Sequence, residues 1–171
     1  MTTTSDGPDG RLAPLSVGTP APDLALLQAP NSVVTLRGLL NRPVILAFYP
    51  MDWEPVSREQ LTLYQCYADA FDRLSACLLG ISVDSVHCHA AFARDAQLRF
   101  PLLADFHPRG LVARQYGVYR DARGVSARAL FVLDAQHVIR FSQVYPDQLN
   151  PGVDDLLTTL EALATGSGPT T

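Results

Sequence analysis

An almost unbroken apolar run, PVILAFYP at residues 43–50, most constrains what this chain can fold into. A strand in which nearly every residue is apolar is buried on both faces, as strands are in the middle of a parallel sheet. A second run of this kind, ACLLGISVD at residues 76–84, follows after a segment with helical periodicity. Two buried strands joined by a helix form a βαβ unit, so the centre of the fold is predicted to be α/β.

Shorter patterns on both sides extend the predicted sheet. Residues 23–36, DLALLQAPNSVVTL, favour a hairpin around Pro30 and Asn31. ALFVLD and VIRFSQV favour a second hairpin around Ala135 and Gln136, and PLLAD favours a short strand. The sheet is therefore predicted to be mixed, with parallel strands in the middle and antiparallel strands added by the hairpins.

The helices are predicted from period and capping signals. The last one is expected to begin with Asn150 as N-cap and Pro151 at the first helical position, followed by acidic residues. Ser85 can cap an earlier helix, and Gly117 can end a short one. The predicted helices cover residues 55–74, 85–97, 107–117 and 150–165.

Composition favours one soluble globular domain. The chain has 171 residues, of which 47% are hydrophobic and 18% charged, which is ordinary for a folded domain. The net charge of −4 argues against nucleic acid or an anionic membrane as partner. All basic side chains are Arg, which excludes Schiff-base chemistry and a phosphate-binding Lys. We expect a domain over residues 17–165, with flexible tails at 1–16 and 166–171.

Targeting signals and a disulfide framework are not expected. Residues 1–16 lack the apolar segment of a secretory signal. No apolar run approaches the roughly 20 residues of a membrane span. Cys66, Cys77 and Cys88 are an odd number of thiols in a chain of this length. The cytoplasm is therefore the expected location.

The candidate site lies where residues 43–50 run through a turn into the helix that starts near Pro55. Open α/β sheets bind ligands at the carboxyl ends of their strands. Ser57 falls in the first helical turn, where unpaired N–H groups and the helix dipole favour negative charge. A cysteine there would be reactive as a thiolate, but this chain has serine.

The residues of this turn resemble the signature of peroxiredoxins of the alkyl hydroperoxide reductase/thiol-specific antioxidant type. That signature is Pro, three residues, Thr, two residues and the peroxidatic Cys; the matching residues here are Pro50, Glu54 and Ser57. The family's active-site Arg matches Arg128 in ARALFVLD. LLGISVDSVHCHAAFA, FPLLADFHPRGLVARQYGVY and NPGVDDLL are also similar to the family.

The resemblance covers roughly residues 17–164. It implies a thioredoxin-like α/β sandwich with a mixed central sheet flanked by helices. It also implies thiol-dependent reduction of hydrogen peroxide and organic hydroperoxides, with a thioredoxin-like reductant and no bound cofactor or metal.

Two departures from the family contradict the usual reaction cycle. The hydroxyl of Ser57 has a pKa close to that of water and far above neutral pH, and it cannot form the sulfenic acid of the cycle. Glu54 would repel a neighbouring thiolate, and it could instead pair with Arg128. Ser57 is either an engineered replacement for Cys or a natural departure; the second change at Glu54 favours the natural one. The gene's codon at position 57 distinguishes the two.

Other residues of the chain give weaker signals for chemistry. Ser57 lacks the G-x-S-x-G pattern of a hydrolase nucleophile, and Glu54 is a weak base for an alcohol. His87, Cys88 and His89 do not suggest metal, since residues two apart point to different sides of a helix. Cys88 is expected in the first turn of its helix, and it is similar in placement to the resolving Cys of some monomeric peroxiredoxins.

Two functions therefore stay open from the sequence. The first is a redox enzyme of the peroxiredoxin type, with activity carried by Cys88 or abolished at an engineered Ser57. The second is a non-catalytic binding or regulatory protein, as a homodimer or with an active paralogue. Cys88 is expected either to be redox-active, because a helix N-terminus lowers thiol pKa values, or to be an inert, partly buried thiol. Cys66 and Cys77 are expected to be packing residues.

Overall fold

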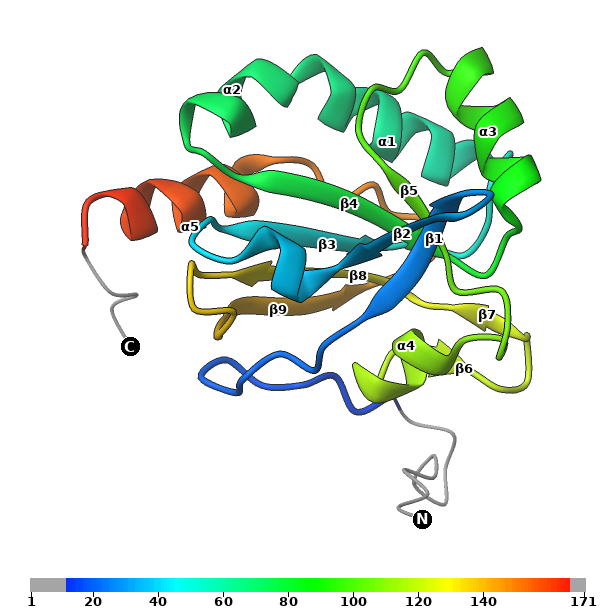
Figure 1. Cartoon of the computed structure of the whole chain (residues 1–171), viewed down its shortest axis with the longest axis horizontal. Helices are drawn as coiled ribbons and strands as arrows, with labels where there is room; N and C mark the ends of the chain where they lie inside the picture. The colour runs from blue at the N-terminus through cyan, green and yellow to red at the C-terminus, as the bar shows by residue number, and fades with distance from the viewer. Residues whose placement is uncertain (1–11, 167–171) are drawn as a thin grey trace.

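The computed structural model describes residues 12–166, and a seven-stranded mixed sheet forms its centre (Figure 1). The strand order is β2-β1-β5-β4-β3-β8-β9. Strands β3, β4 and β5 are parallel, and the remaining pairings are antiparallel. The strands are β1 (Ala25–Ala29), β2 (Ser32–Thr35), β3 (Val44–Phe48), β4 (Cys77–Ser82), β5 (Leu102–Ala104), β8 (Arg128–Leu133) and β9 (Ile139–Tyr145). The predicted mixed sheet is confirmed.

Helices and a small hairpin cover the two faces of the sheet (Figure 1). Helices α1, α2, α3 and α5 supply side chains to the core on one face, while α4 and the hairpin β6–β7 pack on the other. The helical elements are η1 (Leu36–Leu39), α1 (Pro55–Cys66), α2 (Ala68–Arg73), α3 (Val86–Asp95), α4 (Leu111–Gln115) and α5 (Asp154–Ala164). The hairpin strands are β6 (Tyr119–Arg120) and β7 (Val125–Ser126). This is the thioredoxin-like sandwich that the resemblance implies.

The central strand β3 supplies both cores because its side chains alternate between the two faces. All five of its residues are buried, as the apolar run predicts. Ile45, Ala47 and the following Tyr49 face the helical core, and Val44, Leu46 and Phe48 face the other. Substituting a polar residue anywhere along β3 would therefore place an unpaired polar group inside one of the cores.

Four local predictions were wrong, one of them the helix expected over residues 107–117, which covers only Leu111–Gln115. The helix expected over residues 55–74 breaks at Tyr67 into α1 and α2. Helix α5 begins at Asp154, because the Asn150 side chain accepts a hydrogen bond from the Gly152 N–H (3.1 Å) and closes a turn instead of capping a helix. Cys66 is exposed at the end of α1, so it is not a packing residue.

The first residues that the structure describes are hydrogen-bonded to the folded body. Residues 12–16 belong to the expected N-terminal tail, yet Ala13 and Leu15 donate backbone hydrogen bonds to Gly117 (3.1 Å) and Tyr116 (3.2 Å). The rest of the expected tails, residues 1–11 and 167–171, lies outside the described residues. Among the described residues, none of the helices combines the length and the apolar character needed to cross a membrane.

Candidate functional site

Glu54 caps the helix that carries Ser57. The chain leaves β3, passes through a turn and enters α1 at Pro55, whose missing N–H costs nothing at the first helical position. The Glu54 carboxylate accepts hydrogen bonds from the backbone N–H groups of Val56 (3.0 Å) and Ser57 (2.7 Å). The Glu54 carboxylate therefore occupies the N-terminal end of α1, which is the end of a helix that favours anions.

Ser57 and Arg128 meet at this carboxylate. The Ser57 hydroxyl donates to Glu54 Oε2 at 2.7 Å, and Arg128 Nη2 pairs with the same oxygen at 2.9 Å. Arg128 Nη1 also donates to Ser57 Oγ at 3.4 Å. The pairing of β8 with β3 places Ala129 beside Phe48, so Arg128 lies next to the point where β3 ends. The ion pair considered from the sequence is present.

Two further acceptors hold the Arg128 guanidinium in place. Nη1 donates to the Gln60 side-chain oxygen at 2.7 Å, and Nε and Nη2 donate to the Asp147 carbonyl oxygen at 3.2 and 2.9 Å. Gln60 in turn donates to the Tyr64 hydroxyl at 3.0 Å. Sequence reasoning missed Gln60, although it lies three residues after Ser57 and so on the same face of α1.

Most of the side chains in this group are inaccessible to solvent. Ser57 and Arg128 are both 0% exposed, and Pro50 is buried just after β3. The Glu54 side chain keeps 27% of its surface exposed. Desolvation alone would raise the pKa of Glu54, but hydrogen bonds from Ser57, from Val56 and from Arg128 outweigh it and lower this pKa. Glu54 is therefore a carboxylate at neutral pH, held by all of these donors.

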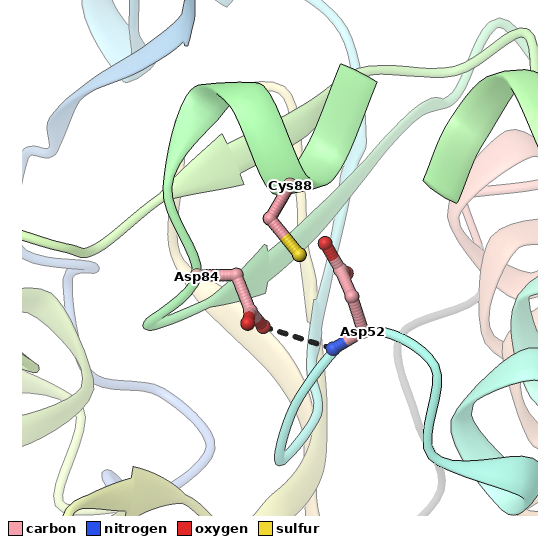
Figure 2. Close-up of side chains that lie close together, drawn as sticks. All are labelled: Asp52, Asp84 and Cys88. Carbon is pink, nitrogen blue, oxygen red and sulfur yellow. Dashed lines mark hydrogen bonds between the residues drawn. The ribbon is translucent and has the colours of Figure 1, made fainter. Parts of the chain in front are cut away.

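Cys88 lies in the first turn of α3, as the sequence predicts, and Ser85 caps this helix by accepting from the Cys88 N–H (3.3 Å). Its half-buried thiol faces Asp52 and Asp84 (Figure 2). Burial, then the charge and hydrogen bonding of Asp52 and the charge of Asp84, raise the pKa of this thiol to about 11. The sequence-based expectation of a lowered pKa here was wrong, because burial of the thiol and the two nearby carboxylates outweigh the helix N-terminus.

Asp52 anchors a second polar network, beside the one at Ser57. Its carboxylate accepts from the Tyr49 hydroxyl at 2.8 Å and pairs with His89 Nδ1 at 2.8 Å, while its backbone N–H donates to Asp84 Oδ2 at 2.8 Å. Sequence reasoning missed this network. The available signal was a carboxylate shortly after each of two neighbouring parallel strands, β3 and β4.

Comparisons of sequence show what the chain is similar to. The AhpC/TSA family model matches residues 17–142. Alkyl hydroperoxide reductase E of Mycobacterium tuberculosis is 34% identical over 131 residues, 76% of this chain and 86% of that protein. Peroxiredoxin 2 of Thermoplasma acidophilum is 31% identical over 154 residues, 86% of this chain and 75% of that protein.

Solved structures agree with the sequence comparisons. Peroxidoxin BcpB from Mycobacterium tuberculosis superposes with a TM-score of 0.77 at 30% identity, covering 86% of this chain and 97% of that one. The reduced 2-Cys peroxiredoxin of Plasmodium vivax has a TM-score of 0.78 at 27% identity, covering 89% and 83% of the two chains.

Proposed function

Since the chain belongs to the AhpC/TSA family, we propose that it is a peroxiredoxin-type protein in which the thiol peroxidase cycle does not run, and that it acts as a binding or regulatory member of the family. Relatives named as alkyl hydroperoxide reductases and peroxiredoxins set the family activity, which is reduction of peroxides by a thiolate. The observation that carries the proposal is the closed group formed by Glu54, Ser57 and Arg128.

The chemistry at position 57 argues against peroxide reduction. Attack on an O–O bond needs an anionic, oxidisable nucleophile, and the product in this family is a sulfenic acid. An alcohol keeps its proton at neutral pH, since one guanidinium and a helix N-terminus shift a pKa by only a few units. Ser57 donates that proton to Glu54 at 2.7 Å, which holds the hydroxyl in its neutral form.

The surroundings of Ser57 argue in the same direction. A peroxide needs hydrogen-bond donors near the nucleophile, and the suitable ones are the Val56 and Ser57 N–H groups and the Arg128 guanidinium. Each of these donates to the Glu54 carboxylate. Ser57 and Arg128 are also wholly buried. The side chain of Glu54 thus takes the place that a thiolate and its substrate would share.

Cys88 does not offer a replacement nucleophile. With a pKa of about 11, the Cys88 thiol keeps its proton at pH 7. The reactive form of cysteine is the thiolate, so this environment favours an unreactive thiol. The redox enzyme that the sequence left open through Cys88 is therefore the less supported function.

Peroxide consumption tests the proposal. The purified protein is mixed with hydrogen peroxide and either thioredoxin with its reductase or dithiothreitol, and Cys88→Ala is assayed beside it. We expect neither protein to consume peroxide faster than the reductant alone. Saturable turnover that Cys88→Ala abolishes would show that Cys88 is the nucleophile, and saturable turnover that survives would show another; both would overturn the proposal.

A binding role also requires a partner. We propose that the partner is a second copy of the chain or a catalytically active relative. Light scattering of the pure protein across a range of concentrations tests for self-association. We expect a dimer. A monomer at every concentration would exclude self-association and would restrict the proposal to a partner of another sequence, to be tested by mixing the chain with active peroxiredoxins of the same organism.

A further inference from the structure

Two carboxylates and a thiol, side chains of the kinds that ligate metals, converge at the edge of the sheet where β3 and β4 end (Figure 2). Asp52 comes from the turn after β3, Asp84 from the turn after β4, and Cys88 from the first turn of α3. The Cys88 Sγ and one carboxylate oxygen from each Asp all lie within 4.8 Å of one another. The parallel pairing of β3 with β4 brings the two turns together.

We propose that Asp52, Asp84 and Cys88 form a binding site for a divalent transition-metal ion of the zinc class, with water completing the coordination. In a tetrahedral zinc site with bonds of roughly 2.0–2.3 Å, neighbouring ligand atoms are about 3.4 Å apart. The three donor atoms, which lie within 4.8 Å of one another, would close to that spacing when the ion binds. On binding, the Cys88 thiol loses its proton to solvent and its sulfur forms the metal bond. No oxidation or reduction is involved.

The carboxylates are held in place by other groups, as metal ligands usually are. Asp52 Oδ1 accepts from the Tyr49 hydroxyl and Oδ2 pairs with His89 Nδ1, both at 2.8 Å. Asp84 Oδ2 accepts from the Ser82 hydroxyl at 2.6 Å and from the Asp52 N–H at 2.8 Å. Both of these donors use Oδ2, so Oδ1 of Asp84 is the oxygen that we assign to the metal.

His89 contacts Asp52 but is not one of the three donors. Its ring is 2% exposed, Nδ1 points to Asp52, and Nε2 has no hydrogen-bond partner among the described residues. Within residues 12–166, Asp84 has no ion pair with a basic side chain, so its charge is left for a bound cation.

The donor set selects the kind of metal. Thiolate is a soft ligand that suits zinc and related ions, while magnesium and calcium require oxygen ligands throughout. Two carboxylates with one thiolate therefore favour Zn²⁺ or Co²⁺ over Mg²⁺ and Ca²⁺. The exposed His87, next to Cys88 in the chain, is not one of the three donors.

Titration of the full-length reduced protein with Co²⁺ and Zn²⁺ tests the site. Cobalt reports a sulfur ligand through a sulfur-to-metal charge-transfer band in the near ultraviolet, and zinc affinity follows from competition with a chromophoric chelator. We expect one ion per chain, the charge-transfer band, and a zinc-dependent rise in Tm. Magnesium at the same concentrations should give none of these.

Matched variants assign the ligands. Cys88→Ser should abolish the charge-transfer band and weaken zinc binding at least about tenfold, and the near-isosteric Asp84→Asn should weaken it to a similar degree. Cys66→Ser and His87→Ala, which alter an exposed thiol and an exposed imidazole, should leave both readouts unchanged, and circular dichroism checks that every variant is folded. A band that survives Cys88→Ser, a band lost in Cys66→Ser, or no saturable binding to the parent protein would overturn the proposal.

Discussion

Reinstalling a thiol at position 57 probes the role of Glu54 directly. In Ser57→Cys the new sulfur would lie near Glu54 Oε2, since the native hydroxyl is 2.7 Å from it. Arg128 Nη1 would also lie near it, at about the present 3.4 Å. The carboxylate opposes ionisation of the thiol and the guanidinium favours it, so their difference sets the thiol pKa.

The two effects are similar in size. At an effective dielectric constant of about 20, unit charges 3.4 Å apart, the present distance from Arg128 Nη1 to Ser57 Oγ, interact by about 5 kcal/mol. That corresponds to three or four pKa units. In Ser57→Cys the opposing charges nearly cancel, and the thiol pKa should remain near its ordinary value of about 8.5. In Ser57→Cys with Glu54→Thr only Arg128 and the helix N-terminus act, and the pKa should fall by about two units or more.

Thiolate absorbance against pH measures both pKa values, with the parent protein subtracted to remove the three native thiols. Rate constants for hydrogen peroxide, measured in parallel, should be much larger for the double variant. Threonine can still cap α1, so the comparison isolates the charge of Glu54. Equal thiol pKa values in the two variants would mean that Glu54 does not govern this site, and would refute the electrostatic reasoning.

Further expectations concern stability. Arg128→Met should lower the free energy of unfolding in urea by about 3 kcal/mol, because it leaves the Glu54 carboxylate without its buried partner. Arg58→Met, at an exposed ion pair, should change this free energy by less than about 1 kcal/mol. Equal effects of the two substitutions would contradict the role assigned to burial. The lowered folded-state pKa of Glu54, against an ordinary 4.5, stabilises the protein above pH 4.5 and is lost as pH falls through the folded value. The Tm advantage of the parent over Glu54→Gln should therefore shrink below about pH 4.5, and a constant difference would contradict the assigned charge. Ser85→Ala should cost about 1 kcal/mol in urea unfolding through loss of the α3 cap, and no measurable loss would show that the cap is not stabilising.

The central sheet could be predicted from the sequence because its signal is local. The apolar runs of β3 and β4 show burial on both faces, and turn residues mark both hairpins. The start of α5 could not be predicted in the same way. Asn150 can cap a helix or close a turn, and Gly152, at a positive φ of 74°, permits the turn. Both outcomes use the same side chain, and only packing decides between them.

The candidate site was predictable where a motif or a strand end fixed the residue. Glu54, Ser57 and Arg128 meet because one turn and one strand register bring them to the end of β3. The pKa of Cys88 was not predictable, since it depends on burial of the thiol and on Asp52 and Asp84, which approach it only in the fold. A residue's position on a helix is a property of the sequence, whereas its electrostatic surroundings are a property of the tertiary structure.

A single-turnover reaction with peroxide tests the central claim most directly. Fully reduced protein is mixed with one equivalent of hydrogen peroxide and no reductant, and residual peroxide is followed by stopped flow. The mass of the chain is then measured by mass spectrometry. We expect peroxide to disappear no faster than it does with an ordinary unactivated thiol, with the peptide that contains Ser57 unchanged. Rapid loss of one equivalent of peroxide, with one oxygen atom or a disulfide appearing on the chain, would contradict the account.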